Sequence, residues 1–238
     1  MPTMAILAGG LGTRLRPATQ EIPKSLIDVN GQPFIAHQLR LLRGQGVRRV
    51  VVCTGHLGGQ IEQAIGSGQS FGLSIRYSHD GDRLLGTAGA LRKALPLLEE
   101  TFFVTYGDSY LPCDLRAVHR TFAKAQKPAL MTVYENRGQY DRSNVEFSDG
   151  RICAYRKDRQ SSAMHHIDYG LGVFHRRTFD EVRAGERFDL ATLYAQLLQR
   201  GALAAHEVTQ RFYEIGSPAG LEETRHYLLE QERAVEPA

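Results

Sequence analysis

An apolar run at the start of the chain breaks directly into a glycine-rich loop. Residues 3–8 are short and apolar enough to form one buried strand, and residues 9–17 (Gly-Gly-Leu-Gly-Thr-Arg-Leu-Arg-Pro) follow. Because glycine has no Cβ, the backbone amides of such a loop can approach an anion closely. Arg14 and Arg16 add positive charge beside the loop, and Lys24 adds more a few residues later. The sequence therefore predicts a phosphate site at the end of a buried first strand.

Two common phosphate-binding motifs do not fit this loop. The dinucleotide fingerprint needs a third glycine where this chain has Leu15, and the P-loop needs Gly-Lys-Ser/Thr where it has Gly12-Thr13-Arg14. The loop instead resembles the signature of the sugar-1-phosphate nucleotidyltransferases, in which Gly-Gly-x-Gly-Thr-Arg-Leu-x-Pro precedes a Pro-Lys pair. Residues 9–17 and Pro23-Lys24 match that signature almost residue for residue. The alternative, a tight turn with solvated arginines, explains the glycines but not the cations.

The first half of the chain alternates between strand-like and helix-like patterns. Strands are predicted at 3–8, 47–54, 73–78, 102–106 and 129–134, and helices at 33–46, 60–65, 87–98 and 114–125. Asp114 is expected to cap the last of these helices. This order predicts an α/β fold with a doubly wound, mostly parallel, Rossmann-like sheet. The family resemblance implies the GT-A-like form of that fold.

After residue 135 the pattern changes. Strands at 143–147 and 151–155 flank a hairpin turn, a further strand is predicted at 167–174, and helices at 189–200 and 219–233 bracket a strand at 204–208. We expect this small β-rich part to cover the open edge of the sheet. The chain then forms a single nucleotidyltransferase domain, with a nucleotide-binding half at 1–135 and a sugar-phosphate-binding half at 136–238.

Composition excludes several classes of partner. The formal net charge is +3, and the chain has no run of basic residues of the kind that binds nucleic acid. Nucleic acid is therefore not an expected partner. No apolar run approaches the roughly 20 residues needed to span a bilayer, and residues 1–4 carry no basic region ahead of a signal-type apolar segment, so we expect a cytoplasmic protein without membrane contact. The three cysteines are too far apart for a disulfide framework or a zinc site.

Ligands of an open α/β sheet bind outside the carboxyl ends of its strands. The resemblance implies that the phosphate loop and the segment Leu-Gly-Thr-Ala-Gly at 85–89 hold the nucleotide. The predicted nucleotide-binding residues are Leu7, Ala8, Gly9, Gly10, Gly12, Thr13, Gly86, Thr87 and Ala88. By itself, the segment 85–89 could equally be a helix N-terminus with Thr87 as its cap.

Two acidic residues are candidates for a magnesium site. Asp108 directly follows the predicted strand 102–106, where a carboxylate is poorly solvated unless a cation pairs with it. The segment 213–218 (Tyr-Glu-Ile-Gly-Ser-Pro) resembles the second acidic motif of the family, usually Asp-x-Gly-Thr, so Glu214 is the second predicted ligand of Mg²⁺. In the alternative, Ser217 caps the last helix and Glu214 is incidental.

The sugar side departs from the family pattern. Residues 168–170 read Asp-Tyr-Gly where the family commonly has Asn-Ala-Gly, and residues 143–145 read Ser-Asn-Val where it often has Tyr-Gly-Val. The predicted sugar-phosphate-binding residues are Tyr106, Gly107, Asn144, Lys157, Asp168 and Gly170. Lys157 lies one residue short of the spacing that the family's sugar-phosphate lysine usually has, so a solvated lysine is the alternative.

The resemblance implies a reaction between a nucleoside triphosphate and a sugar 1-phosphate, with Arg14 and Lys24 as catalytic residues. The chain's length and its Leu-Gly-Thr-Ala-Gly segment favour GTP and a heptose or mannose 1-phosphate. Uridylyl, thymidylyl and cytidylyl transfer stay open, as does a catalytically silent nucleotide-sugar-binding regulator. A homodimer is the assembly considered.

Overall fold

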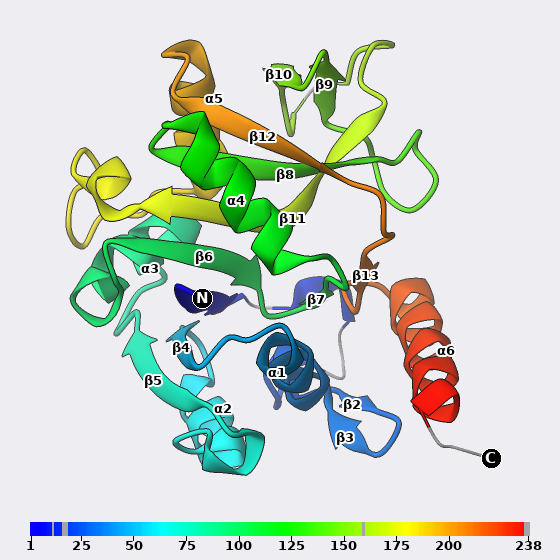
Figure 1. The fold of residues 1–238 in the computed structure, drawn as a ribbon. Helices are drawn as coiled ribbons and strands as arrows, with labels where there is room; N and C mark the ends of the chain where they lie inside the picture. Colours follow the sequence, from blue (N-terminus) through cyan, green and yellow to red (C-terminus); the bar gives the residue numbers. More distant parts are fainter. Residues whose placement is uncertain (11, 16–18, 159, 236–238) are drawn as a thin grey trace.

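A computed structural model describes residues 1–10, 12–15, 19–158 and 160–235, without the side chains of Arg14 and Val235. The predicted alternation of strands and helices is confirmed for the first half (Figure 1). Its main elements are β1 (Thr3–Ala8), α1 (Phe34–Gly44), β4 (Arg49–Thr54), α2 (Gly58–Ile65), β5 (Ser74–His79), α3 (Gly86–Ala94), β6 (Thr101–Tyr106), α4 (Leu115–Ala125) and β8 (Ala129–Glu135). The predicted cap of α4 is also confirmed, because the Asp114 carboxylate accepts hydrogen bonds from the backbone amides of Arg116 and Ala117.

The second half contributes four further main strands, of which β11 is the longest, and two helices. These elements are β9 (Val145–Ser148), β10 (Arg151–Tyr155), β11 (His166–His175), α5 (Leu190–Gln199), β12 (Leu203–Val208) and α6 (Pro218–Val235). The sequence patterns missed the shortest strands, β2 (Asp28–Val29), β3 (Gln32–Pro33), β7 (Ser109–Tyr110) and β13 (Tyr213–Glu214). They also missed the 3-10 turns η1 (Thr13–Leu15), η2 (Lys24–Leu26), η3 (Gln69–Phe71), η4 (Leu95–Leu97) and η5 (Arg176–Phe179). Two-residue strands leave no periodic pattern to detect.

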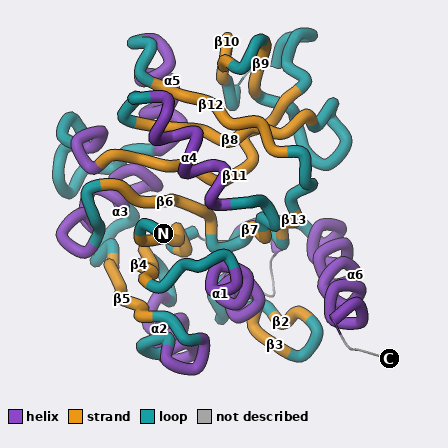
Figure 2. The backbone as a smooth tube through the Cα atoms, viewed as in Figure 1, coloured by secondary structure: helices purple, strands orange, loops and turns teal. Residues whose placement is uncertain are grey.

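One central sheet unites both halves. Within the described residues it has nine strands, in the order β10-β9-β11-β6-β1-β4-β5, with β8 beside β11 and β12 beside β8. The strands β6, β1, β4 and β5 run parallel, so that Ile6 lies opposite both Val52 and Thr105. Figure 2 shows the helices packed around this sheet. The carboxyl ends of the parallel strands therefore meet at one edge.

The second half covers the open edge that the parallel strands leave at β6, and β11 does so by extending the sheet. This strand lies inside the sheet, antiparallel to β6 on one side and to β8 on the other, while β12 and the β9–β10 hairpin lie at edges of the sheet. Its residues Leu171, Val173 and Phe174 are all buried. A strand buried on both faces is stable only between neighbours in a covered sheet. The proposed division of one domain at residue 135 stays a prediction.

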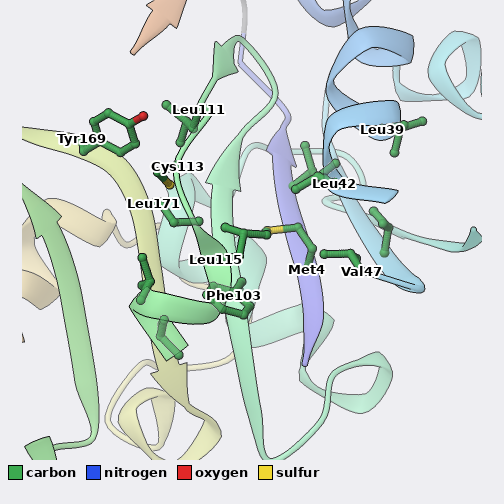
Figure 3. Packing of buried hydrophobic residues seen from close by; sticks show 14 of the residues in the cluster. Met4, Leu39, Leu42, Val47, Phe103, Leu111, Cys113, Leu115, Tyr169 and Leu171 are labelled. Carbon is green, nitrogen blue, oxygen red and sulfur yellow. The ribbon is translucent and has the colours of Figure 1, made fainter. Parts of the chain in front are cut away.

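Two apolar cores cover the two faces of the sheet. On one face, Met4 and Ile6 of β1 pack with side chains of α1, α2 and α4, and Figure 3 shows part of this core. On the other face, Ala5 packs with buried residues of α3 and α5. Strand side chains alternate between faces, which explains how one strand serves both cores. In the described part of the chain, no helix has the length and apolar character that crossing a bilayer requires.

A third, smaller core joins the C-terminal helix to the segment that follows the glycine-rich loop. Leu228 of α6 and Ile215 pack with Ile27, Val29 and Phe34. Arg225 of α6 also donates a 3.0 Å hydrogen bond to the Asp28 carbonyl. Helix α6 and Ile215 before it are thereby held against residues 27–34.

Candidate active site

The ends of β1 and β6 form the floor of the site. The Gly107 amide donates a 2.9 Å hydrogen bond to the Leu7 carbonyl, which keeps the two strand ends adjacent. A Cβ at Gly107 would lie 3.0 Å from Ala8 Cβ, so a larger residue there would push the two segments apart. The loop that follows β1 and the turn that follows β6 therefore open toward the same space.

The first cavity, of about 310 Å³, lies at these strand ends. Ten predicted residues line it: Leu7, Ala8, Gly9, Gly10, Lys24, Gly86, Thr87, Tyr106, Gly107 and Asp108. Seven further residues complete its wall, namely Ser25, Cys53, Asp80, Leu84, Ala90, Arg187 and Asp189. Burial raises the pKa of the Cys53 thiol to about 12, so this side chain is a neutral part of the wall.

The second cavity, of about 380 Å³, lies between the ends of β6 and β11 and the loops of the second half. Seven predicted residues line it: Tyr106, Asp108, Asn144, Lys157, Asp168, Gly170 and Glu214. The sequence reasoning missed Ser109, Asp141, Arg142, Ser143, Arg156, Gln160, Ile167, Tyr169 and Phe212. Because Tyr106 and Asp108 line both cavities, two ligands bound side by side would meet at these two residues.

An ion pair lies at this junction. Lys24 Nζ is 2.6 Å from Asp108 Oδ2, and the two side chains are 14% and 33% exposed. Lys24 begins η2, where Pro23 precedes it in an extended conformation. Lys24 is mostly buried. A polyphosphate bound beside it would lose much of its water, and the positive charge of Lys24 would then compensate the phosphate charge. The structure thus brings together the predicted catalytic lysine and the predicted magnesium ligand.

A buried glutamine of α1 holds the turn that carries Asp108. Gln38 is 2% exposed, and its Nε2 donates 2.8 Å hydrogen bonds to the carbonyls of Tyr106 and Ser109. These two carbonyls flank Gly107 and Asp108. The sequence signal for this role was a lone amide on the apolar face of a helix, which motif reasoning did not use.

Glu214 is brought to the same region by a short strand pair. In the β7–β13 pair, Glu214 lies opposite Ser109, and the Ile215 amide donates a 3.0 Å hydrogen bond to the Asp108 carbonyl. Its carboxylate accepts hydrogen bonds from the Ser217 hydroxyl, at 2.9 Å, and from the Gly216 amide. The pairing of two short strands therefore connects the two acidic motifs across the chain.

The alternative for this motif is also visible in the structure. Ser217 Oγ accepts a 3.0 Å hydrogen bond from the Gly220 amide, as a helix cap does, and the Glu214 carboxylate supports that cap. Both roles are compatible, because each carboxylate oxygen has more than one acceptor direction. The role of Glu214 as a ligand of Mg²⁺ stays a prediction.

The donor set near the junction is suited to a hard cation. Asp108 and Glu214 both line the second cavity, and Mg²⁺ is bound through carboxylate oxygens, waters and substrate phosphates. Among the described residues, no group of three or more His, Cys, Asp or Glu side chains could hold a metal ion without other ligands. One or two carboxylates with phosphates as further ligands is the arrangement that Mg²⁺ usually takes.

A half-buried acid, Asp168, lines the second cavity. Asp168 receives a 3.1 Å hydrogen bond from the Gly170 amide, and its own amide donates to Asn144 Oδ1 at 2.9 Å. Burial raises the pKa of the Asp168 carboxyl, and the positive charge of Lys157 opposes that rise. Burial, Asp168, Asp108 and then Asp189 raise the pKa of the Tyr106 hydroxyl, which therefore stays neutral. The junction carries neutral and anionic oxygens that can accept or donate hydrogen bonds.

Several predicted residues do not line either cavity. The Gly12 carbonyl accepts a 2.7 Å hydrogen bond from the Thr19 hydroxyl, Thr13 is exposed in η1, and Ala88 is fully buried. The nucleotide contacts predicted for Gly12, Thr13 and Ala88 stay predictions. The catalytic role predicted for Arg14 depends on its side chain, which the structure does not describe. Arg16 also lies outside the described residues.

Residues 4–143 match the family model described as nucleotidyl transferase. The chain belongs to the nucleotidyl transferase family. This finding confirms the family inferred from the glycine-rich loop and the Pro-Lys pair.

Curated relatives of this family member carry different nucleotides and sugars in their names. This chain is 29% identical to N-acetylmuramate alpha-1-phosphate uridylyltransferase of Neisseria meningitidis, over 92% of its own length and 95% of that protein. It is 30% identical to UTP–glucose-1-phosphate uridylyltransferase of Synechocystis and to mannose-1-phosphate guanyltransferase beta-B of Xenopus laevis, over 82% and 90% of this chain. The chain spans only 55% and 61% of the length of the latter two relatives.

Solved structures of the same fold also match nearly the whole length of this chain. HddC from Yersinia pseudotuberculosis, complexed with GMP-PN, superposes with a TM-score of 0.77 at 22% identity, over 96% of this chain and 100% of that one. At this identity the likeness shows the fold alone. The predicted Rossmann-like nucleotidyltransferase fold is confirmed.

Proposed function

We propose that this protein is a sugar 1-phosphate nucleotidyltransferase, which joins a nucleoside triphosphate to a sugar 1-phosphate and releases pyrophosphate. The observation that carries the proposal is the pair of adjoining cavities, which share Tyr106 and Asp108 and have Lys24 at their junction. Two reacting phosphates bound in neighbouring cavities would meet at that ion pair. The first cavity takes the nucleotide and the second takes the sugar phosphate.

The reaction needs no general base. A sugar 1-phosphate has a second pKa of about 6, like other phosphate monoesters, and is largely a dianion at neutral pH. One of its oxygens attacks the α-phosphorus of the triphosphate. The new phosphorus–oxygen bond forms as the bond from the α-phosphorus to the bridging oxygen breaks, and pyrophosphate leaves with that electron pair. The protein therefore contributes positioning and charge neutralisation.

The roles of the chain's own residues follow from their places. The backbone at Gly9 and Gly10 cradles the phosphate chain, and Arg14 adds positive charge beside it. Lys24 neutralises the negative charge that the two reacting phosphates share at the junction. When Mg²⁺ is bound, Asp108 and Glu214 would hold it, and it supplies further charge neutralisation between the phosphates.

GTP with a heptose or mannose 1-phosphate is the first candidate substrate pair. The Leu-Gly-Thr-Ala-Gly segment at 85–89 and the match to mannose-1-phosphate guanyltransferase beta-B of Xenopus laevis support it. UTP with N-acetylmuramate 1-phosphate is the second candidate. The Neisseria relative supports it, because this chain covers 95% of that protein.

A panel assay tests the activity and chooses between these pairs. Purified protein is given each of GTP, UTP, dTTP and CTP with each sugar 1-phosphate, and pyrophosphate release is measured with and without Mg²⁺. We expect magnesium-dependent release with one pair well above the others. If the protein binds a triphosphate but releases pyrophosphate with none of the sugar phosphates, it is a regulator and the proposal is wrong.

A further inference from the structure

The segment before α5 lies against the turn that begins α3, although about 100 residues separate them. The Phe188 amide donates a 2.8 Å hydrogen bond to the Leu85 carbonyl. The Phe188 carbonyl accepts in return from the amides of Ala88, at 2.9 Å, and Gly89, at 3.0 Å. Three backbone hydrogen bonds thus fix a single residue of the segment.

Thr87 provides a fourth attachment from its side chain. Its Oγ1 accepts a 2.6 Å hydrogen bond from the Leu190 amide, which is the first residue of α5. Asp189 stands at the N-cap position of α5, and its own side chain makes no capping hydrogen bond. Thr87 therefore caps a different helix from the one on which it lies.

The two glycines of the turn allow this close approach. Gly86 has φ +70°, and a Cβ there would lie 2.7 Å from the Phe188 carbonyl oxygen. A Cβ at Gly89 would lie 2.7 Å from the Glu186 carbonyl oxygen. Any larger residue at either position would displace the segment. The Gly-Thr-Ala-Gly sequence is thus explained by the segment packed on it, in addition to any contact with a nucleotide.

This attachment holds Arg187 and Asp189 at the first cavity. Both side chains line that cavity, and they flank Phe188, the residue that the hydrogen bonds fix. Among the described residues that line this cavity, Arg187 and Lys24 are the ones with cationic side chains. The planar guanidinium of an arginine can bind two oxygens of one phosphate at once.

We propose that residues 186–189 form a nucleotide-binding element, in which Arg187 binds the triphosphate and Thr87 is a positioning residue that acts by fixing this segment. The proposal rests on the proposed function for the identity of the ligand. If Thr87 acts only by fixing the segment, its effect on triphosphate binding depends on Arg187. If Thr87 contacted the ligand directly, its effect would not depend on Arg187.

Direct binding, measured by calorimetry without turnover, tests the role of Arg187. The probes are GTP and UTP, each compared with its monophosphate. Since a lost hydrogen bond to a charged group costs about 1.5–3 kcal/mol, we expect Arg187→Met to weaken triphosphate binding by about 10- to 100-fold. Monophosphate binding should change far less. Equal losses for both would mean that Arg187 contacts the base or ribose, and no loss would remove it from the site; either result overturns the proposal.

The role of Thr87 is tested by a double-mutant cycle. Thr87→Val removes the acceptor for the Leu190 amide at nearly constant shape, and we expect weaker triphosphate binding, with Thr87→Ser restoring it. Combined with Arg187→Met, Thr87→Val should add little. Additive effects would mean that Thr87 acts on the ligand directly. Thr121→Val is the matched control, because the Thr121 hydroxyl forms a 2.8 Å hydrogen bond with His206 Nδ1, and neither residue lines a cavity described above.

The two proposals fail in different ways. If the wild-type protein binds the triphosphate through Arg187 but releases no pyrophosphate, the proposed function is wrong and the binding element stands. If it releases pyrophosphate and Arg187→Met binds like wild type, the function stands and the binding element is wrong. If it binds none of the triphosphates, both are wrong.

Discussion

Replacing Lys24 with methionine should reduce turnover far more than stability. The substitution keeps most of the side-chain length and removes the charge that lies 2.6 Å from Asp108. Because Asp108 is 33% exposed, solvent screens the pair, and we expect its loss to cost about 1 kcal/mol of folding free energy or less. Losing one preorganised charge at the reacting phosphates typically costs about 3 kcal/mol, or on the order of 10²-fold in kcat.

Steady-state kinetics separate these effects. Pyrophosphate release gives kcat and the KM for the triphosphate, and a thermal melt gives the stability of the same sample. Lys127→Met is the matched control, since Lys127 Nζ donates a 3.1 Å hydrogen bond to the Leu203 carbonyl and lines neither cavity. It should melt slightly earlier than wild type and keep its kcat.

One result would refute the reasoning about Lys24. If Lys24→Met keeps the wild-type kcat and raises only the KM, the lysine binds the triphosphate without stabilising the transition state. A loss of activity that tracks the loss of folded protein would point the same way. In either case the junction of the two cavities would not be the reacting centre.

Substitutions at three further residues test the carboxylates of the site. Asp108→Asn should abolish magnesium-dependent activity and leave the melting temperature nearly unchanged, because an amide lacks the anionic oxygen that a hard cation prefers; unchanged activity across a magnesium titration would remove Asp108 from the site. Glu214→Gln should raise the magnesium concentration for half-maximal activity, and Glu214→Asp should raise it less; a wild-type magnesium dependence with earlier melting would leave Glu214 only its support of the Ser217 cap. Asp168→Asn should lower activity but raise the melting temperature at pH 7, because burial raises the pKa of Asp168 and so makes its charged form costly in the folded state. This stability gain should fade as the pH falls from the raised pKa of Asp168 toward about 4, and it should be absent below about 4, where the carboxyl is protonated both folded and unfolded; a gain that persists there would contradict the assignment.

The sequence by itself determined the family, the order of most elements and the glycine-rich loop after β1. These features are local, because a strand, a helix or a glycine-rich turn is specified by neighbouring residues. The rule that ligands bind at the carboxyl ends of parallel strands then placed Gly9, Gly10, Gly107 and Asp108 at one site, and all four line the first cavity. The helix cap by Asp114 was predicted for the same local reason.

Only the tertiary structure decided how distant parts complete the site. The insertion of β11 beside β6, the β7–β13 pair that carries Glu214, and the packing of residues 186–189 on the turn at 85–89 each join segments far apart in the chain. The hydrogen bond from Leu190 to Thr87 spans 103 residues. Such contacts depend on which surfaces bury each other when the whole sheet assembles, and no local pattern of residues records that choice.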